Sequence, residues 1–335
     1  MKKINWGIIG CGDVTEIKSG PALYKTDRSS LIAVMRRDAV KAKDYAHRHN
    51  VPRWYDDANK LIHDDDINAI YIATPPSTHE EFAMAAINAG KNVYLEKPMA
   101  LDAASAKRIV EAANNKKIKL VIAHYRRAQP FFKKIKQLLD EKIIGEVKFA
   151  SLAFYKRSFS KYDLQITKNA WRVNAAIAGG GLFHDLAPHQ LDLMLYYFGD
   201  ANIAAGYSIN QERSYSADDI VAGNIVFNCG VLFNGIWCFT VDQSGEKDSC
   251  EIVGTKGKIT FSVFGEHTIT ISLDEKTETF TFDIPAHVQQ PMIEKVVAHF
   301  LNDGPNPCSG EVGVKVMQLI EAFTQNNSTE MGNKF

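Results

Sequence analysis

The stretch Ile4-Asn5-Trp6-Gly7-Ile8-Ile9-Gly10-Cys11-Gly12-Asp13-Val14-Thr15 decides the fold of the first part of the chain. A short apolar run ends in a glycine turn, and a helical pattern follows. This order is typical of a dinucleotide-binding βαβ unit, in which the free N–H groups at the start of the helix meet a pyrophosphate. Thr15 replaces the third glycine of the usual fingerprint, so the pattern alone is a weak signal. The residues of this turn that we expect to bind the cofactor are Gly10, Gly12, Asp13 and Val14.

Four further apolar runs follow, and helical patterns separate them. The runs span 31–35, 69–73, 93–95 and 120–123, and the helical patterns span 39–49, 78–89 and 102–115. Strands that alternate with helices of this length indicate a doubly wound parallel sheet. We therefore predict that residues 1–124 form an α/β Rossmann domain.

The end of the second strand carries the residues that distinguish NAD from NADP. An acidic side chain there binds the ribose 2′-hydroxyl of NAD, whereas an arginine accommodates the 2′-phosphate of NADP. The chain has Arg36 and Arg37 at this place, followed by Asp38. Two guanidinium groups can hold a phosphate through charge-assisted hydrogen bonds, so NADP is favoured. The alternative is that both arginines are solvated and Asp38 binds the ribose of NAD.

Two more motifs lie at strand ends, on the edge where open α/β sheets bind ligands. The loop 73–79 is stiffened by two prolines, and by itself it indicates a structural turn. Glu96-Lys97-Pro98 is the sharper signal, because Pro98 restricts Lys97 to extended geometry and can aim its ammonium into a site. The residues of these two loops that we expect to contact the cofactor are Thr74, Pro75, His79, Glu96 and Lys97.

A second stretch, Gly179-Gly180-Gly181-Leu182-Phe183-His184-Asp185-Leu186-Ala187-Pro188-His189-Gln190-Leu191-Asp192, carries candidate chemistry. Three glycines suit a turn in which the backbone passes close to another group. A helix then begins, with Asp185 able to cap it and Pro188 in its first turn. Asp185, His189 and Asp192 share one helix face, so a carboxylate could orient the histidine for proton transfer. The alternative is that Asp185 only caps the helix and His189 packs in the core.

Taken together, these motifs resemble the Gfo/Idh/MocA family of nicotinamide-dependent oxidoreductases, over essentially the whole chain. The resemblance rests on Gly10-Cys11-Gly12, Glu96-Lys97-Pro98 and the stretch 179–192. It implies that residues 125–335 form a larger α+β domain with a mostly antiparallel open sheet, and that a sugar or polyol binds between the two domains. It also implies a proton-handling site made of Lys97, Asp185 and His189.

The expected reaction is reversible hydride transfer between nicotinamide C4 and a secondary alcohol carbon. His189 would act as the acid or base, Asp185 would orient it, and Lys97 would bind the reacting oxygen. Lys97 could instead carry the proton itself. Redox-neutral NAD-using glycosidases and non-enzymatic NADP-sensing regulators have the same fold, and both remain alternatives. Further candidates to meet the cofactor are Arg126, Trp171 and Arg172.

The second half of the chain changes pattern, because consecutive short β patterns joined by tight turns favour an antiparallel sheet. They span 147–154, 203–210, 219–228, 231–242, 250–253, 258–263, 268–273 and 277–283, with helical patterns at 131–141, 291–301 and 311–324. Helices on one face of such a sheet leave the other face needing cover, so we predict a homodimer or homotetramer through it. The residues expected on that open face are Phe227, Leu232, Phe233, Ile236, Trp237 and Phe239.

Composition argues against several other classes of protein. Lys+Arg and Asp+Glu both total 39, and a chain of zero net charge is a poor candidate for nucleic-acid binding. The five cysteines form no CxxC motif, so we expect neither a metal site nor disulfides, and a reducing compartment is favoured. No stretch approaches the roughly 20 apolar residues of a membrane span, and no signal-peptide pattern opens the chain, so we expect a cytoplasmic protein without a membrane partner.

Overall fold

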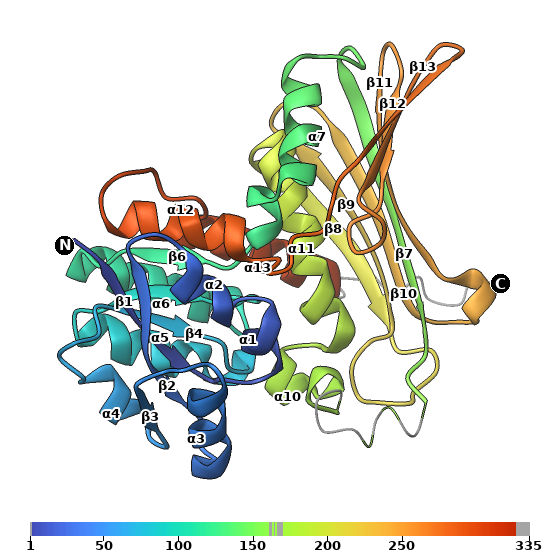
Figure 1. The fold of residues 1–335 in the computed structure, drawn as a ribbon. Coiled ribbons are helices and arrows are strands. Elements are labelled where there is room, and N and C mark those ends of the chain that lie inside the picture. Colours follow the sequence, from blue (N-terminus) through green and yellow to red (C-terminus); the bar gives the residue numbers. More distant parts are fainter. Residues whose placement is uncertain (1, 161–162, 164, 166–169, 326–335) are drawn as a thin grey trace.

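The computed structural model describes residues 2–160, 163, 165 and 170–325. Two β-sheets organise them (Figure 1). Sheet A is entirely parallel and has six strands, as predicted for a Rossmann domain. In spatial order they are β3 (Arg53–Tyr55), β2 (Ser29–Met35), β1 (Ile4–Ile9), β4 (Ala69–Ile72), β5 (Asn92–Leu95) and β6 (Leu120–Ile122).

Helices lie between consecutive strands of sheet A and cover it. They are α1 (Asp13–Ile17), α2 (Gly20–Lys25), α3 (Ala39–Arg48), α4 (Ala58–Ile62), α5 (His79–Asn88) and α6 (Ala103–Lys116). Local sequence sets their starts, since Asp38 and Asp102 cap α3 and α6 by accepting bonds from Lys41 N and Ser105 N. Strand β4 is buried at every position, as expected for a parallel strand covered on both faces.

Sheet B has eight strands and is mostly antiparallel, with one parallel pair, β7 and β10. In spatial order the strands are β14 (Lys276–Thr281), β13 (Thr268–Leu273), β12 (Lys258–Phe261), β11 (Lys247–Gly254), β7 (Val147–Arg157), β10 (Leu232–Val241), β9 (Ile220–Phe227) and β8 (Ala201–Ile209). Helices α7 (Pro130–Asp140), α11 (Gly181–Phe198) and α13 (Gly310–Thr324) lie on one side of this sheet (Figure 1). The predicted α+β architecture of the second half is therefore confirmed.

The prediction for the open face of sheet B was wrong at four of its six positions. Strand β10 alternates between exposed and buried residues, because successive side chains of a strand point to opposite faces. Leu232 and Ile236 are exposed, whereas Phe233 and Trp237 are fully buried. The other two residues assigned to the open face that lie in the core are Phe227 and Phe239.

The open face of sheet B is nevertheless apolar, because other strands supply residues for it. Ile203 of β8 pairs with Val226 of β9, which pairs in turn with exposed Leu232, and Leu232 pairs with exposed Phe149 of β7. The exposed large apolar residues of these strands are Phe149, Ile203, Tyr207, Ile209, Leu232 and Ile236.

The C-terminal helices return to the Rossmann domain. Phe300 of α12 (Gln290–Phe300) packs against Trp6 of β1, with ring centroids 5.6 Å apart. Ile122 N of β6 donates to Cys308 O at 2.9 Å, and Glu321 of α13 accepts from Ala103 N at 2.7 Å. Residues assigned from sequence to a second domain at 125–335 thus also complete the surroundings of sheet A.

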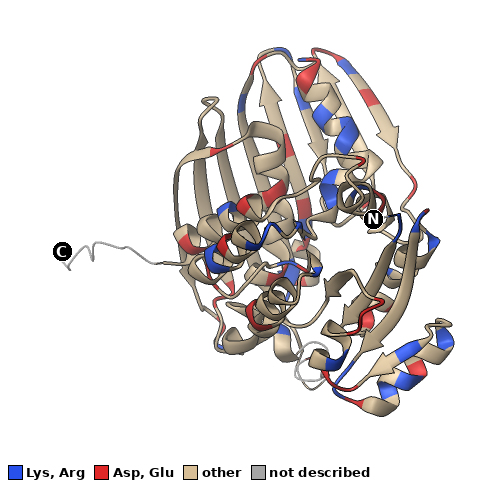
Figure 2. Cartoon of the chain, turned by 90° about the vertical axis from the view of Figure 1, so that its left-hand side faces the viewer, with Lys and Arg blue, Asp and Glu red and all other residues tan. Residues whose placement is uncertain are grey.

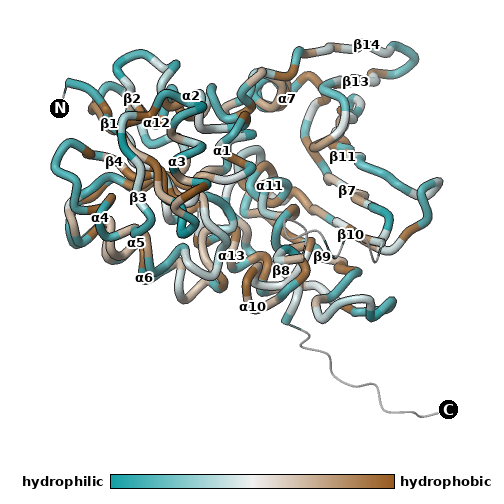
Figure 3. Tube along the Cα trace, turned by 60° about the horizontal axis from the view of Figure 1, so that its bottom comes forward, coloured by the Kyte–Doolittle hydropathy of each residue, from teal (hydrophilic) through white to brown (hydrophobic). Residues whose placement is uncertain are grey.

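Charge and hydropathy follow these layers. Lysine, arginine, aspartate and glutamate are interspersed over the chain (Figure 2), and hydrophobic segments gather along the strands of sheet A (Figure 3). Among the described helices, none is long and apolar enough to cross a membrane.

Candidate active site

The glycine turn after β1 combines a close backbone contact with open space. Gly10 has φ +93°, and a Cβ there would lie 2.8 Å from the Thr74 side chain. Gly12 is the N-cap of α1, and a Cβ there would meet nothing nearer than Gly10 O at 3.9 Å. Asp13 and Val14 begin α1, so their N–H groups have no intrahelical acceptor. The turn therefore presents free donors beside room for a phosphate.

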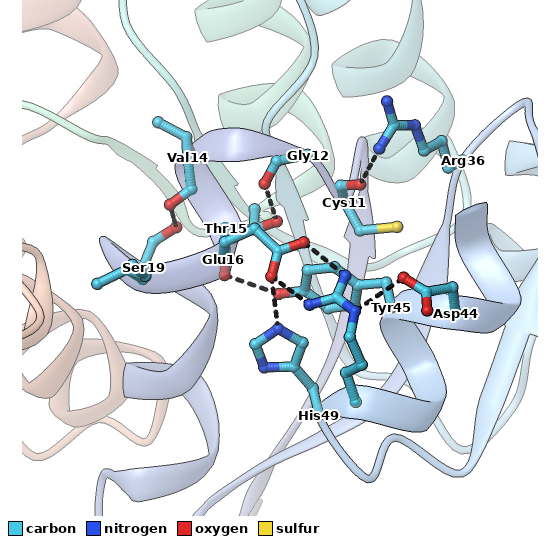
Figure 4. Close-up of polar contacts among 12 residues, drawn as sticks. Cys11, Gly12, Val14, Thr15, Glu16, Ser19, Arg36, Asp44, Tyr45 and His49 are labelled. Carbon is cyan, nitrogen blue, oxygen red and sulfur yellow. Dashed lines mark hydrogen bonds and ion pairs between the residues drawn. The ribbon is translucent and has the colours of Figure 1, made fainter.

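Helix α1 is fastened to α3 beneath this turn (Figure 4). Thr15, at the third glycine position, is buried; its hydroxyl donates to Gly12 O, and its carbonyl accepts from Tyr45. Glu16 accepts two bonds from Arg48, at 2.7 and 2.8 Å, and lies 3.0 Å from the His49 ring. The Arg48 bonds lower the pKa of Glu16 to about 2, so this link stays ionic.

The second strand ends in the basic pair beside that turn. Arg36 Nη1 donates to Cys11 O at 3.3 Å, so its guanidinium lies next to the glycine turn (Figure 4). Arg37 is exposed. The Asp38 carboxylate accepts from Lys41 N at 3.2 Å and pairs with the Lys41 ammonium at 3.3 Å. Asp38 is thus engaged as the cap of α3.

The His79 ring bridges the two strand-end loops through a backbone carbonyl of each. It is fully buried, with Nδ1 2.9 Å from Pro98 O and Nε2 2.7 Å from Thr74 O. Thr74 also accepts a hydrogen bond from the Thr78 hydroxyl, and Pro75 opens the short helix η1 (Pro76–Thr78). The structure therefore places His79 behind the ligand edge, where it braces the loop that follows Lys97.

Lys97 and Asp185 meet at the centre of the site. Lys97 Nζ donates to Asp185 Oδ1 and to its carbonyl oxygen, both at 2.8 Å. The second carboxylate oxygen accepts from Arg172 Nε at 2.9 Å, and the Arg172 guanidinium lies over the Trp171 ring. Burial acts to raise the pKa of Asp185, but Lys97 and Arg172 outweigh it and leave that pKa below its ordinary value.

His189 lies near this ion pair in an aromatic setting. Its ring is edge-on to Tyr125 and Phe264, with centroids 5.1 and 5.7 Å away. Its Nδ1 is buried and has no hydrogen-bond partner in the part of the chain that the structure describes. Burial, reinforced by the charges of Lys97 and Arg126, holds the pKa of His189 well below its usual value. The imidazole is therefore neutral near pH 7.

The expectation that Asp185 orients His189 or caps its helix was wrong in both forms. Both Asp185 oxygens bind cations, and the helix begins earlier, since α11 starts at Gly181 with Gly180 as its N-cap. Gly179 and Gly181 have positive φ, and a Cβ on Gly180 would collide with the His184 ring. Close packing against this ring, and of Gly181 against Ala217, gives the glycine triplet a structural reason.

Asp192 belongs to a separate ion pair. It is 1% exposed, and its carboxylate accepts from both Nε and Nη2 of Arg127. Arg127 lies on η2 (Tyr125–Ala128), directly after β6, so the pair ties this turn to α11. The spacing predicted that Asp192 shares a helix face with Asp185 and His189, but in the structure its carboxylate pairs with Arg127.

Glu96 faces away from the ligand edge into a buried network. Its carboxylate accepts from Tyr71 OH and Gln289 Nε2, both at 2.6 Å, and from Lys97 N at 3.1 Å. Gln289 also accepts from Tyr94 OH and joins the C-terminal segment to β5. This network holds the backbone on which Lys97 stands.

Sequence reasoning missed two residues of this region. His124 lies two residues after the end of β6 and is buried, with both ring nitrogens unpaired among the described residues, and burial lowers its pKa to about 4. Its position at a strand end, the same signal that singled out Lys97, could have found it. Gln289 comes from a distant segment that carries no local signal.

The Arg127–Asp192 pair yields a stability prediction. Arg127→Met should lower the free energy of unfolding by about 3–5 kcal/mol, because it leaves a buried carboxylate without its partner. Urea unfolding followed by circular dichroism measures this loss. The double variant Arg127→Met, Asp192→Leu should recover most of it, and a double variant as unstable as the single one would contradict the interpretation.

Comparisons with known proteins agree with this geometry. Residues 4–124 match the oxidoreductase family with an NAD-binding Rossmann fold, and residues 132–260 match the GFO/IDH/MocA C-terminal domain. The chain is 48% identical to oxidoreductase P35 of Formosa agariphila over 322 residues, 96% of this chain and 98% of that protein.

Solved structures show the same fold at lower identity. A levoglucosan dehydrogenase in complex with NADH and levoglucosan has a TM-score of 0.84 at 20% identity, covering 96% of both chains. A 3-ketoreductase from Actinomadura kijaniata in complex with NADP and TDP-benzene has a TM-score of 0.79 at 21% identity, covering 96% of this chain and 98% of that one. The chain belongs to the Gfo/Idh/MocA family of NAD(P)-binding oxidoreductases.

Proposed function

We propose that this oxidoreductase transfers a hydride between nicotinamide C4 and a secondary alcohol or carbonyl of a sugar, a polyol or a related small molecule. One observation carries the proposal: Lys97, at the end of β5, holds its ammonium against Asp185 of α11, with His189 one helical turn further on. The levoglucosan bound by one of the two solved relatives agrees with a sugar-like substrate.

The residues of sheet A fit a bound nicotinamide dinucleotide. The free N–H groups of Asp13 and Val14 and the open space above Gly12 suit the pyrophosphate. We favour NADP over NAD, because the partly buried Arg36 lies beside the glycine turn, while the nearby Asp38 carboxylate is already engaged with Lys41. When bound, the nicotinamide supplies the hydride acceptor or donor.

The chain's own residues then handle the oxygen and its proton. The Lys97 ammonium donates a hydrogen bond to the reacting oxygen and stabilises negative charge on it. Asp185 fixes the direction of that ammonium. His189 is a neutral base suited to take the hydroxyl proton during oxidation and to return it during reduction.

The first test of this site uses two single variants. Lys97→Met and His189→Gln should each lower kcat for the best substrate of a sugar and polyol panel by about two orders of magnitude or more, the usual scale for losing acid–base help. Nicotinamide fluorescence should show that both variants still bind the cofactor. Wild-type turnover in both variants would refute the site, and the absence of net nicotinamide reduction by any substrate would favour a redox-neutral enzyme or a sensor.

Cofactor choice is tested at Arg36. Arg36→Ala should weaken binding of NADP by about tenfold or more, since a charge-assisted bond to the 2′-phosphate is lost, and should change NAD binding little. Titration of both cofactors by fluorescence measures this. Arg53→Ala, at an arginine of sheet A that pairs with Asp64 and Asp66, is the matched control. An equal loss for both cofactors would contradict the assignment.

We also propose that the open face of sheet B forms a homodimer or homotetramer interface. Large apolar residues from three of its strands, Phe149 of β7, Ile203 of β8 and Leu232 of β10, are aligned across this face. Such aligned, exposed apolar side chains are typical of a surface that is covered by a partner.

Light scattering at micromolar concentration measures this assembly. The wild-type chain should have the mass of a dimer or tetramer, and the double variant Leu232→Asp, Ile236→Asp should have the mass of a monomer, because each change places a charge on the apolar face. The variant Lys148→Asp serves as the control, because Lys148 is a polar side chain that is already exposed. A monomeric wild-type protein would sink the proposal.

A further inference from the structure

Arg126 is a buried arginine without a close counter-ion. The residue is 8% exposed, and its Nη1 donates to Val263 O at 2.6 Å. Nε is buried and has no partner, and across the described residues no carboxylate lies within 4.0 Å of the guanidinium. Burying a charge without a partner costs several kcal/mol, so this arginine requires a reason.

The guanidinium lies beside the candidate base. Its central carbon is 4.4 Å from the centroid of the Phe264 ring and 5.5 Å from that of Tyr125. Both rings are edge-on to His189. Arg126 and His189 therefore share the same two aromatic neighbours, and the Arg126 charge acts on the His189 imidazole.

One carboxylate stands further off and is already occupied. Asp248 acts on Arg126 electrostatically, but its oxygens accept from the backbone N–H groups of Val263, Phe264 and Gly265. These three bonds fix the turn after β12. Asp248 therefore organises the wall of the site and forms no ion pair with Arg126.

The charges that act most strongly on His189 are positive. Lys97, Arg126 and Lys18 all act on the imidazole as positive charges. Asp185 is shared between two cations, and Asp192 is neutralised by Arg127. Such an excess of one sign attracts ligands of the opposite sign.

We propose that the substrate of this site carries a carboxylate, as uronic acids do, and that Arg126 binds this carboxylate. Nη1 is committed to Val263 O and Nε is covered by other protein atoms, so Nη2 is the nitrogen that remains to donate a charge-assisted hydrogen bond to a carboxylate oxygen. This inference rests on the proposed hydride transfer, because it assigns the substrate class of the same site.

The test compares acid and neutral sugars of the same configuration. For D-glucuronate against D-glucose, and D-galacturonate against D-galactose, kcat/KM for nicotinamide reduction should favour the acid by about tenfold or more in the wild-type enzyme. Arg126→Gln should abolish this preference, and Arg126→Lys should keep part of it. Arg108→Gln, at an exposed arginine paired with Glu80, should leave it unchanged. A neutral sugar preferred by the wild-type enzyme, or an equal loss on both members of a pair in Arg126→Gln, would overturn the proposal.

A binding measurement keeps the test independent of the variants. With NADP present, D-glucuronate should raise the Tm of the wild-type protein more than D-glucose does, and added salt should reduce the difference. A larger rise with glucose 6-phosphate would reject the carboxylate in favour of a phosphate ester. If glucuronate binds but no reduced nicotinamide forms, the proposed hydride transfer is refuted and the carboxylate assignment stands. If glucose is oxidised faster than glucuronate, the carboxylate assignment is refuted and hydride transfer stands.

Discussion

The contact between Lys97 and Asp185 is the interaction on which this site depends. The two residues are 88 positions apart and belong to different layers, one at the end of a strand in sheet A and the other on a helix that packs against sheet B. Both charges are largely removed from water, and such a pair is favourable only when its geometry is held well. The rest of the site supplies that support. His79 braces Pro98 behind the lysine, Glu96 accepts from the lysine's own N–H, and Arg172 holds the second oxygen of Asp185.

Some of the charged residues around this contact hold the structure together, and others are available for the proposed chemistry. The pairs Arg127–Asp192 and Arg48–Glu16 hold separate structural elements together. His189 instead has a ring nitrogen without a hydrogen-bond partner among the described residues, and its pKa is lowered by burial and by neighbouring cations. A histidine held neutral beside an oriented ammonium is suited to move a proton on and off an oxygen. Arg126 extends the same environment with a positive charge that the described part of the chain does not neutralise at short range.

The C-terminal segments connect the two sheets. Gln289 bonds to Glu96 and Tyr94 beneath β5, and its own N–H donates to Lys18 O after α1. Helix α13 then packs on α6 and on β8. The two halves of the chain are therefore held by the same C-terminal stretch, so the position of Lys97 relative to His189 depends on residues nearly two hundred positions further along the chain than Lys97.

The sequence by itself determined the layers and most elements of the fold, because strand and helix patterns are local and repeat every two or 3.6 residues. It also singled out Lys97, Asp185 and His189, since strand ends and helix faces can be read from spacing. Only the tertiary structure decided the partners. In the structure, Asp185 pairs with Lys97 and not with His189, and Asp192 pairs with Arg127. The ring nitrogens of His79 lie against two backbone carbonyls. The tertiary structure also decided which face of β10 is buried. The spacing of residues along one helix or strand determines which side chains share a face of that element. The hydrogen-bond partner of a side chain is instead set by the packing of elements that are distant in sequence.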